Sequence, residues 1–292
     1  MAKILSGKEV SDALNANLIE RSAALREKGV NPTLAIVRVG ENPSDLSYEK
    51  GATKRAEVVG VSIKNYVLDA ECTKEELLAV IDEINADDSI HGCLMFRPLP
   101  KHLKNDQNEI CNRLDPKKDV DSMTHLSNAG IYEGRDDLGF PPCTAQACME
   151  ILDHYNIQTA GKKAVVIGRS LVIGRPASLM LMHRNATVTT IHTKTKNPMD
   201  YLPYADIIIC AAGVLNSVTA EQVRPGQVVI DVSMNWNPEK ITSKGKGGMS
   251  GDCKFEEVEP IVEAITPVPG GVGAVTTSVL MKHVIVAAER SC

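Results

Sequence analysis

The sequence predicts an α/β protein made of two α/β domains, the second of the Rossmann type. Short β-branched apolar runs alternate with segments of helical periodicity along the chain, a pattern typical of mainly parallel sheets. The apolar run 165–167 ends at Gly168, shortly before a helix-like segment over 176–183. That is the layout of a strand, a phosphate-binding turn and a helix N-terminus. The length of 292 residues allows two domains of ordinary size.

In the first half, local signals mark where the helices begin and end. Pro43 suits a helix start and Gly60 a helix end. Thr73 with Glu76 fits a capping box. The predicted elements are helices over 6–28, 42–59, 73–86 and 105–114, and strands over 33–40, 61–68 and 92–96.

In the second half, the loop 139–144 is predicted to be a domain junction. Two of the strands that follow, like the one before Gly168, end in loop residues, and ligands of open α/β sheets bind beyond such strand ends. The predicted elements are helices over 145–155, 176–183 and 276–290, and strands over 165–167, 186–192, 206–211 and 228–232.

Composition limits the class of protein and its partners. A hydrophobic content of 43% supports full cores. A net charge of −5 without a long basic run argues against nucleic acid and anionic membranes as partners. We find no signal peptide and expect no apolar run long enough to span a bilayer, so we expect a cytoplasmic protein. Eight scattered cysteines without zinc spacing predict reduced thiols and no metal site.

The turn after the run 165–167 predicts a dinucleotide site, although its glycines, Gly168 and Gly174, do not follow the G-x-G-x-x-G spacing. An ordinary strand-to-helix turn is the alternative. The strand 186–192 is followed by Thr193 and Lys194, with no carboxylate to bind a ribose hydroxyl. Together with Arg169, such groups suit a 2′-phosphate and therefore NADP. The alternatives are a surface ion pair for Arg169 and a solvated strand end for the lysine.

A glycine- and proline-rich loop over 266–273 precedes the last helix. It holds two prolines and three glycines, which make a rigid loop with close access to its backbone. Such a loop either connects domains or brings backbone amides against a flat ligand.

Four stretches occur in the order and spacing of one known family. They are Val39-Gly40-Glu41-Asn42-Pro43 ahead of Tyr48, Lys118-Asp119-Val120-Asp121, Gly168-Arg169-Ser170 and the loop 266–273. Over nearly its whole length the chain resembles the bifunctional methylenetetrahydrofolate dehydrogenase/methenyltetrahydrofolate cyclohydrolase family. The resemblance implies a folate-binding domain over 1–143 plus 275–292, an NADP-binding domain over 144–274, a cleft between them and a homodimer.

The resemblance also implies site residues. Tyr48 and Asp121 become the catalytic candidates, Tyr48 against the pterin and Asp121 as the acceptor for its amino and ring N–H groups. Without the resemblance, a half-buried helix tyrosine and a loop cap are the simpler interpretations of these two residues. The remaining candidates are Phe96, Pro269, Gly270 and Gly271 for the substrate, and Gly168, Arg169, Ser170, Thr193 and Met234 for the cofactor.

The chain departs from the family at several positions. A strand that usually ends Val-Gln-Leu-Pro-Leu in the family reads Met95-Phe96-Arg97-Pro98-Leu99 here. Ala52 stands where the family has the lysine of Tyr-x-x-x-Lys, and Phe96 replaces the glutamine that supports that lysine. Ser122 and Ala274 replace a glycine and a proline. We therefore expect a dehydrogenase that oxidises 5,10-methylenetetrahydrofolate with NADP and has weak or absent cyclohydrolase activity. The alternatives are a fully bifunctional enzyme and a catalytically silent folate- or nucleotide-binding protein.

Overall fold

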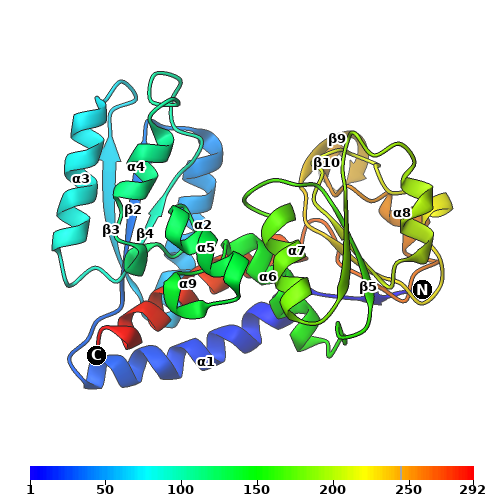
Figure 1. Ribbon diagram of the computed structural model, residues 1–292, viewed down its shortest axis with the longest axis horizontal. Coiled ribbons are helices and arrows are strands. Elements are labelled where there is room, and N and C mark those ends of the chain that lie inside the picture. Colours follow the sequence, from blue (N-terminus) through cyan, green and yellow to red (C-terminus); the bar gives the residue numbers. More distant parts are fainter. Residues whose placement is uncertain (244) are drawn as a thin grey trace. The chain divides into compact units, whose positions relative to one another are not determined.

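The computed structural model describes residues 1–243 and 245–292 and divides into two compact units (Figure 1). Residues 12–143 and 277–292 form the three-stranded unit, and residues 1–11 and 144–276 form the six-stranded unit. Each unit has its own mainly parallel sheet covered by helices, so the predicted α/β fold class is confirmed.

The three-stranded unit has a fully parallel sheet in the order β3-β2-β4. The chain passes from β2 to β3 on one side and later returns to β4 on the other, so the carboxyl ends of β2 and β4 form a topological switch point. Its elements are α1 (Gly7–Glu27, from residue 12 on), β2 (Thr33–Val39), α2 (Pro43–Val59), β3 (Ser62–Leu68), α3 (Lys74–Ala86), β4 (Gly92–Met95), α4 (Gln107–Arg113), α5 (His125–Glu133) and α9 (Val272–Arg290, from residue 277 on).

Apolar residues of β2 alternate between two buried faces, as the period of a strand requires. Ala35 and Val37 pack with Leu77 and Ile81 of α3 in one cluster, and Leu34 and Ile36 on the opposite face are also buried. Local signals set the helix ends: Asn42 and Gly60 cap α2, and Thr73 with Glu76 forms the predicted capping box.

The six-stranded unit has a parallel sheet in the order β1-β11-β8-β7-β5-β6, with a separate hairpin of β9 and β10. From β5 the chain goes to β6 on one side and then to β7 on the other, so a second switch point lies at the carboxyl ends of β5 and β7. The elements are β1 (Lys3–Ile4), α6 (Cys143–His154), β5 (Lys163–Ile167), α7 (Gly174–His183), β6 (Thr187–Ile191), β7 (Ile207–Cys210), β8 (Val228–Asp231), β9 (Asn235–Thr242), β10 (Gly245–Ser250), α8 (Phe255–Val258) and β11 (Ala264–Ile265).

Two expectations need correction. The first residues were assigned to the folate-binding domain, but β1 pairs in parallel with β11, which places residues 1–11 in the six-stranded unit. No run was expected to be long enough for a membrane, yet α9 passes that test by length and composition. Because 67% of its most apolar window is buried inside the protein, we read α9 as a core helix, in keeping with its polar contacts Ser278–Asn15 and Glu289–Arg21 to α1.

Candidate active site

The predicted site residues fall into two groups, one in each unit. Tyr48, Phe96 and Asp121 belong to the three-stranded unit, near the switch point of β2 and β4. The others belong to the six-stranded unit and lie in loops after the carboxyl ends of its strands. They are Gly168, Arg169, Ser170, Thr193, Met234, Pro269, Gly270 and Gly271.

The turn after β5 is closed by two glycines that no other residue could replace without movement. A Cβ atom on Gly168, whose φ is +121°, would lie 2.3 Å from the carbonyl oxygen of Ala211, which follows β7. A Cβ atom on Gly174 would lie 2.3 Å from the carbonyl oxygen of Gly168. The backbone therefore turns sharply at the switch point, and the start of α7 comes against the end of β5.

The start of α7 offers groups suited to an anion. The Ser170 hydroxyl oxygen accepts hydrogen bonds from the N–H groups of Ile173 and Gly174, at 3.1 and 3.3 Å. Backbone donors and the positive end of a helix dipole favour a phosphate at this place. Arg169 is exposed and has no ion-pair partner within residues 1–243 and 245–292.

The loops that follow β5, β6, β7 and β8 carry the other features of a nucleotide site. Thr193 and Lys194 are exposed just after β6, with no carboxylate at that strand end. Three exposed apolar side chains follow the other strands: Leu171 is 63% exposed, Val214 49% and Met234 58%. Such side chains at one edge of a sheet can cover a flat, partly apolar ligand.

Asp252, which the sequence analysis did not single out, organises these loops. Its buried carboxylate accepts N–H bonds from Ala212, Gly213 and Val214 after β7, at 2.7, 3.1 and 2.8 Å. It also accepts a hydrogen bond of 2.9 Å from the hydroxyl of Ser233, which follows β8. Its partners lie some 20 to 40 residues earlier in the chain, so no local pattern could have revealed it.

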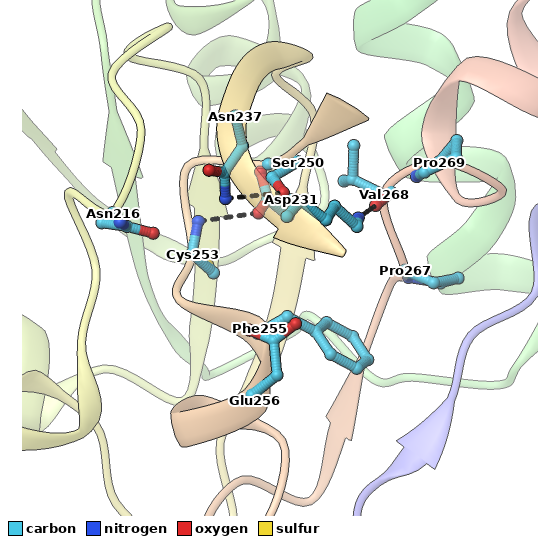
Figure 2. A pocket seen from close by; sticks show the side chains of 12 residues that line it. Asn216, Asp231, Asn237, Ser250, Cys253, Phe255, Glu256, Pro267, Val268 and Pro269 are labelled. Carbon is cyan, nitrogen blue, oxygen red and sulfur yellow. Dashed lines mark hydrogen bonds between the residues drawn. The ribbon is translucent and has the colours of Figure 1, made fainter. Parts of the chain in front are cut away.

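A polar cavity of about 270 Å³ lies beside this network (Figure 2). Asp231, at the end of β8, lines this cavity. Its carboxylate accepts a hydrogen bond of 2.8 Å from the Cys253 N–H group (Figure 2). Burial raises the pKa of Asp231 to about 6, and the neighbouring Asp252 acts in the same direction, against the backbone hydrogen bonds. Pro269 lines the same cavity.

The loop 266–271 is held from two sides within the six-stranded unit. The Lys240 ammonium donates to the carbonyl of Val268 at 3.1 Å and to that of Met249 at 2.6 Å. On the other side the Gly7 N–H donates to the Gly270 carbonyl at 2.9 Å. A Cβ atom on Gly271 would lie 2.6 Å from the Pro267 carbonyl oxygen. These contacts hold the loop 266–271 from both sides; its rigidity stays a prediction from its composition.

In the three-stranded unit, Tyr48 and Phe96 meet edge to face. Their ring centroids are 6.0 Å apart with an interplanar angle of 85°, and both side chains are half-buried. Ala52, one turn after Tyr48 on α2, is fully buried. The structure thus brings together the tyrosine and two of the positions at which the chain departs from the family that it resembles.

Asp121 lies within reach of the same switch point. Its Oδ1 accepts the N–H of Cys143 at 3.0 Å, and its Oδ2 lies 3.5 Å from Nη2 of Arg97, two residues after β4. Burial raises the pKa of the Asp121 carboxyl, while Arg97 and the Cys143 N–H lower it in part. Asp121 therefore accepts a backbone N–H group, as its simpler interpretation as a loop cap expects, and it keeps further lone pairs for a ligand.

The residues before Asp121 have structural contacts. The Lys118 ammonium donates to the carbonyls of Ile84, Asn85 and Asp87, where α3 ends. Buried Asp119 accepts the N–H groups of Met123 and Thr124 at 2.9 and 2.8 Å. The first two residues of the Lys-Asp-Val-Asp motif therefore fix the loop that presents the last one.

Two of the departures from the family have visible effects on the backbone. Ser122 has a φ of +53°, in the left-handed region that favours glycine, and its buried hydroxyl has no hydrogen-bond partner among the residues that the structure describes. Ala274, in the first turn of α9, uses the N–H group that a proline lacks, donating it to Gly271 at 3.0 Å.

Comparison with known proteins decides the family. Residues 5–121 match the model for the catalytic domain of tetrahydrofolate dehydrogenase/cyclohydrolase, and residues 142–292 match the model for its NAD(P)-binding domain. The chain belongs to the tetrahydrofolate dehydrogenase/cyclohydrolase family. The predicted resemblance is confirmed, and the turn after β5 lies in the family's NAD(P)-binding domain.

Individual members of the tetrahydrofolate dehydrogenase/cyclohydrolase family match over the full length. The chain is 48% identical to the "Bifunctional protein FolD" of Carboxydothermus hydrogenoformans, over 99% of this chain and 98% of that one. Among solved structures, the bifunctional FolD of Campylobacter jejuni has a TM-score of 0.93 at 37% identity, covering 100% of both chains. The Trypanosoma brucei FolD, "complexed with NADP cofactor and inhibitor", has a TM-score of 0.91 at 31% identity, over 99% and 98% of the two chains.

The position of Ser122 yields a stability prediction. We expect Ser122→Gly to raise the free energy of unfolding by about 1 kcal/mol, because it relieves a left-handed serine and removes a buried unpaired hydroxyl, less the backbone entropy of glycine. Asn156→Gly is the matched control, since Asn156 has a φ of +56° but asparagine tolerates that region. Denaturant unfolding of the three proteins measures the difference, and equal stability of Ser122→Gly and the parent would contradict it.

Proposed function

We propose that this chain oxidises 5,10-methylenetetrahydrofolate to the methenyl form with NADP, and that it also hydrolyses the methenyl form. The observation that carries the proposal is the pair of switch points. One presents a glycine turn for a dinucleotide, and the other presents Asp121 for a pterin. Among residues 1–243 and 245–292 no group of three or more histidine, cysteine or acidic side chains could hold a metal ion, and none is needed in this chemistry.

The residues after β5 and β6 fit NADP. Gly168 packs against the Ala211 carbonyl and Gly174 against the Gly168 carbonyl, which sets the sharp turn between β5 and α7. A glycine turn of this kind before a helix N-terminus favours a pyrophosphate. We assign the 2′-phosphate to the exposed cation of Arg169 and to Thr193, since an acidic side chain at that strand end would repel it. NADP, when bound, accepts the hydride.

In the three-stranded unit, the chain's own groups bind and orient the folate. Asp121 accepts donors from the pterin edge, as an ionised carboxylate with two oxygens can. The rings of Tyr48 and Phe96 offer faces and edges for the pterin plane. We assign the backbone of Pro269, Gly270 and Gly271 to the folate as well. Positioning of this kind supplies most of the rate for a hydride transfer that needs no protein base.

For the second reaction, the comparisons favour the bifunctional alternative over the dehydrogenase alone. The relative at 48% identity and the C. jejuni structure are both named bifunctional, so the expectation of weak or absent hydrolysis is not supported by them. A dehydrogenase without hydrolysis stays as a second candidate because of one observation: buried Ala52 and Phe96 occupy the places of the family's lysine and glutamine. In the bifunctional case, a group other than residue 52 moves the protons.

The assembly and location expected from the family also remain proposals. We infer a homodimer, which light scattering of the full chain in solution tests. A cytoplasmic location without nucleic-acid or membrane partners is in keeping with the net charge of −5.

The cofactor assignment predicts a selective effect of Arg169→Ala. Losing a charge-assisted contact to a phosphate costs about 1.5–3 kcal/mol, so NADP should bind roughly 10- to 100-fold more weakly while NAD binding changes little. Lys163→Ala is the control, because Lys163 is an exposed cation at the opposite end of β5. Calorimetric titration with both cofactors measures this, and equal affinity of the parent for NADP and NAD would refute the assignment.

The substrate assignment predicts that Asp121→Asn weakens tetrahydrofolate binding and leaves NADP binding intact. The amide cannot accept two donors through both of its end groups, so the expected loss is again roughly 10- to 100-fold. NADP affinity of the same variant controls for folding. Unchanged folate affinity would show that Asp121 is not the pterin anchor.

The hydrolysis is tested with methenyltetrahydrofolate and its near-ultraviolet band. We expect the parent to accelerate its decay over buffer, and Ala52→Lys with Phe96→Gln to accelerate it further, by up to about 10²- to 10⁴-fold if the restored lysine acts as an acid–base group. Phe96→Gln alone, which lacks the ammonium, is the matched control.

Two results would overturn parts of the proposal. A parent that reduces NADP with the methylene substrate but leaves the methenyl form to decay as in buffer is a dehydrogenase alone. A parent that binds both ligands and produces no reduced cofactor is the silent binding protein.

A further inference from the structure

Arg97 forms an ion pair with the pterin-binding candidate Asp121, and it was not among the predicted site residues. It follows Phe96 directly at the end of β4. Its Nη2 atom lies 3.5 Å from Oδ2 of Asp121 and 3.4 Å from the backbone carbonyl oxygen of Asp121. Both side chains are only 21% exposed. The strand of the family ends Val-Gln-Leu-Pro-Leu, so an arginine here stands in place of a leucine.

The two contacts of Nη2 fix the Asp121 side chain relative to its own backbone. Oδ2 faces Arg97, and Oδ1 faces the N–H of Cys143 at 3.0 Å. One oxygen is thus held by each partner. An ionised carboxylate has about four acceptor positions, so each oxygen keeps a place for one more donor, and the two parallel N–H groups of a pterin edge can still bind.

Arg97 also sets the charge of this carboxyl. The groups that face Asp121 are the Arg97 guanidinium, the backbone and thiol of Cys143, and the Asp119 carboxylate. Burial and Asp119 raise the pKa of Asp121, whereas Arg97 and the Cys143 hydrogen bonds lower it. Among these groups Arg97 alone carries a positive charge.

We propose that Arg97 is a positioning residue for substrate binding: it holds the Asp121 carboxylate in its charged form, oriented to accept the paired donors of a pterin. Only the binding of a pterin by Asp121 rests on the proposed function. The ion pair itself is a property of the free protein and can be measured without folate. Arg97 has no part in proton or hydride transfer in this proposal.

The test compares the parent with Arg97→Leu and Arg97→Lys. Leucine is the residue usual in the family, so the first variant is expected to fold. The Asp121 carboxyl carbon is followed by NMR as a function of pH in the full chain without ligand, and its signal is assigned by its loss in Asp121→Asn. We expect the midpoint of Asp121 to rise by about one pH unit in Arg97→Leu, because an opposite charge is removed. Arg97→Lys should restore at least half of the shift.

Binding supplies the second readout. Calorimetric titration with tetrahydrofolate from pH 5 to pH 8 should show the acid-side loss of affinity at a higher pH in Arg97→Leu than in the parent. In the Asp121→Asn background, Arg97→Leu should not move the profile. NADP affinity is the folding control.

The outcomes separate the two claims. An unchanged Asp121 midpoint in Arg97→Leu, or no recovery in Arg97→Lys, overturns the role of Arg97. A shifted midpoint in a protein that binds no tetrahydrofolate at any pH leaves the ion pair in place and overturns the proposed function.

Discussion

The contact between the turn after β5 and the end of β7 is the constraint on which the six-stranded unit depends. Gly168 lies so close to the carbonyl of Ala211 that a single Cβ atom would not fit, and Gly174 packs just as closely on Gly168. This close packing places the first N–H groups of α7 at the switch point of the sheet. The Ser170 hydroxyl accepts two of these N–H groups, and the positive end of the helix dipole favours a phosphate at this place. The loop residues proposed for NADP, Arg169 and Ser170, take their positions from this turn.

Two buried carboxylates, Asp252 and Asp231, stabilise the neighbouring loops. Asp252 accepts five hydrogen bonds from groups after β7, after β8 and in β9. Asp231 accepts hydrogen bonds from the backbone N–H groups of Asp252 and Cys253. Burial outweighs these bonds and raises the pKa of Asp231 to about 6, and the neighbouring Asp252 acts in the same direction.

In the three-stranded unit, side chains of one short loop, residues 118–121, hold the backbone near the candidate group. Each residue of Lys118-Asp119-Val120-Asp121 has its own contacts. The Lys118 ammonium donates to backbone carbonyls at the C-terminal end of α3, and Asp119 accepts N–H groups of the backbone that follows it. Val120 is buried in the core. Asp121 contacts Cys143 and Arg97 and keeps acceptor capacity beyond these contacts. The strained Ser122 directly afterwards shows that this backbone path is maintained even where the residue does not favour it. Both units thus carry their candidate groups at the place where the strand order reverses.

Sequence alone determined the elements whose signals are local. The spacing of apolar residues predicted the α/β class and most helices, the pair Thr73 and Glu76 predicted its capping box, and Gly168 predicted the turn. The family motifs predicted the site residues because their order and spacing are themselves sequence properties. Local patterns could not decide contacts made over long separations. The pairing of β1 with β11 across about 260 residues, the loop partners of Asp252 and the ion pair of Arg97 with Asp121 depend on which strands become neighbours. The hairpin of β9 and β10 was missed because its strands hold glycine, proline and lysine in place of an apolar alternation. Tertiary structure decided these features because burial and hydrogen bonding between distant segments outweigh the weak preferences of single residues.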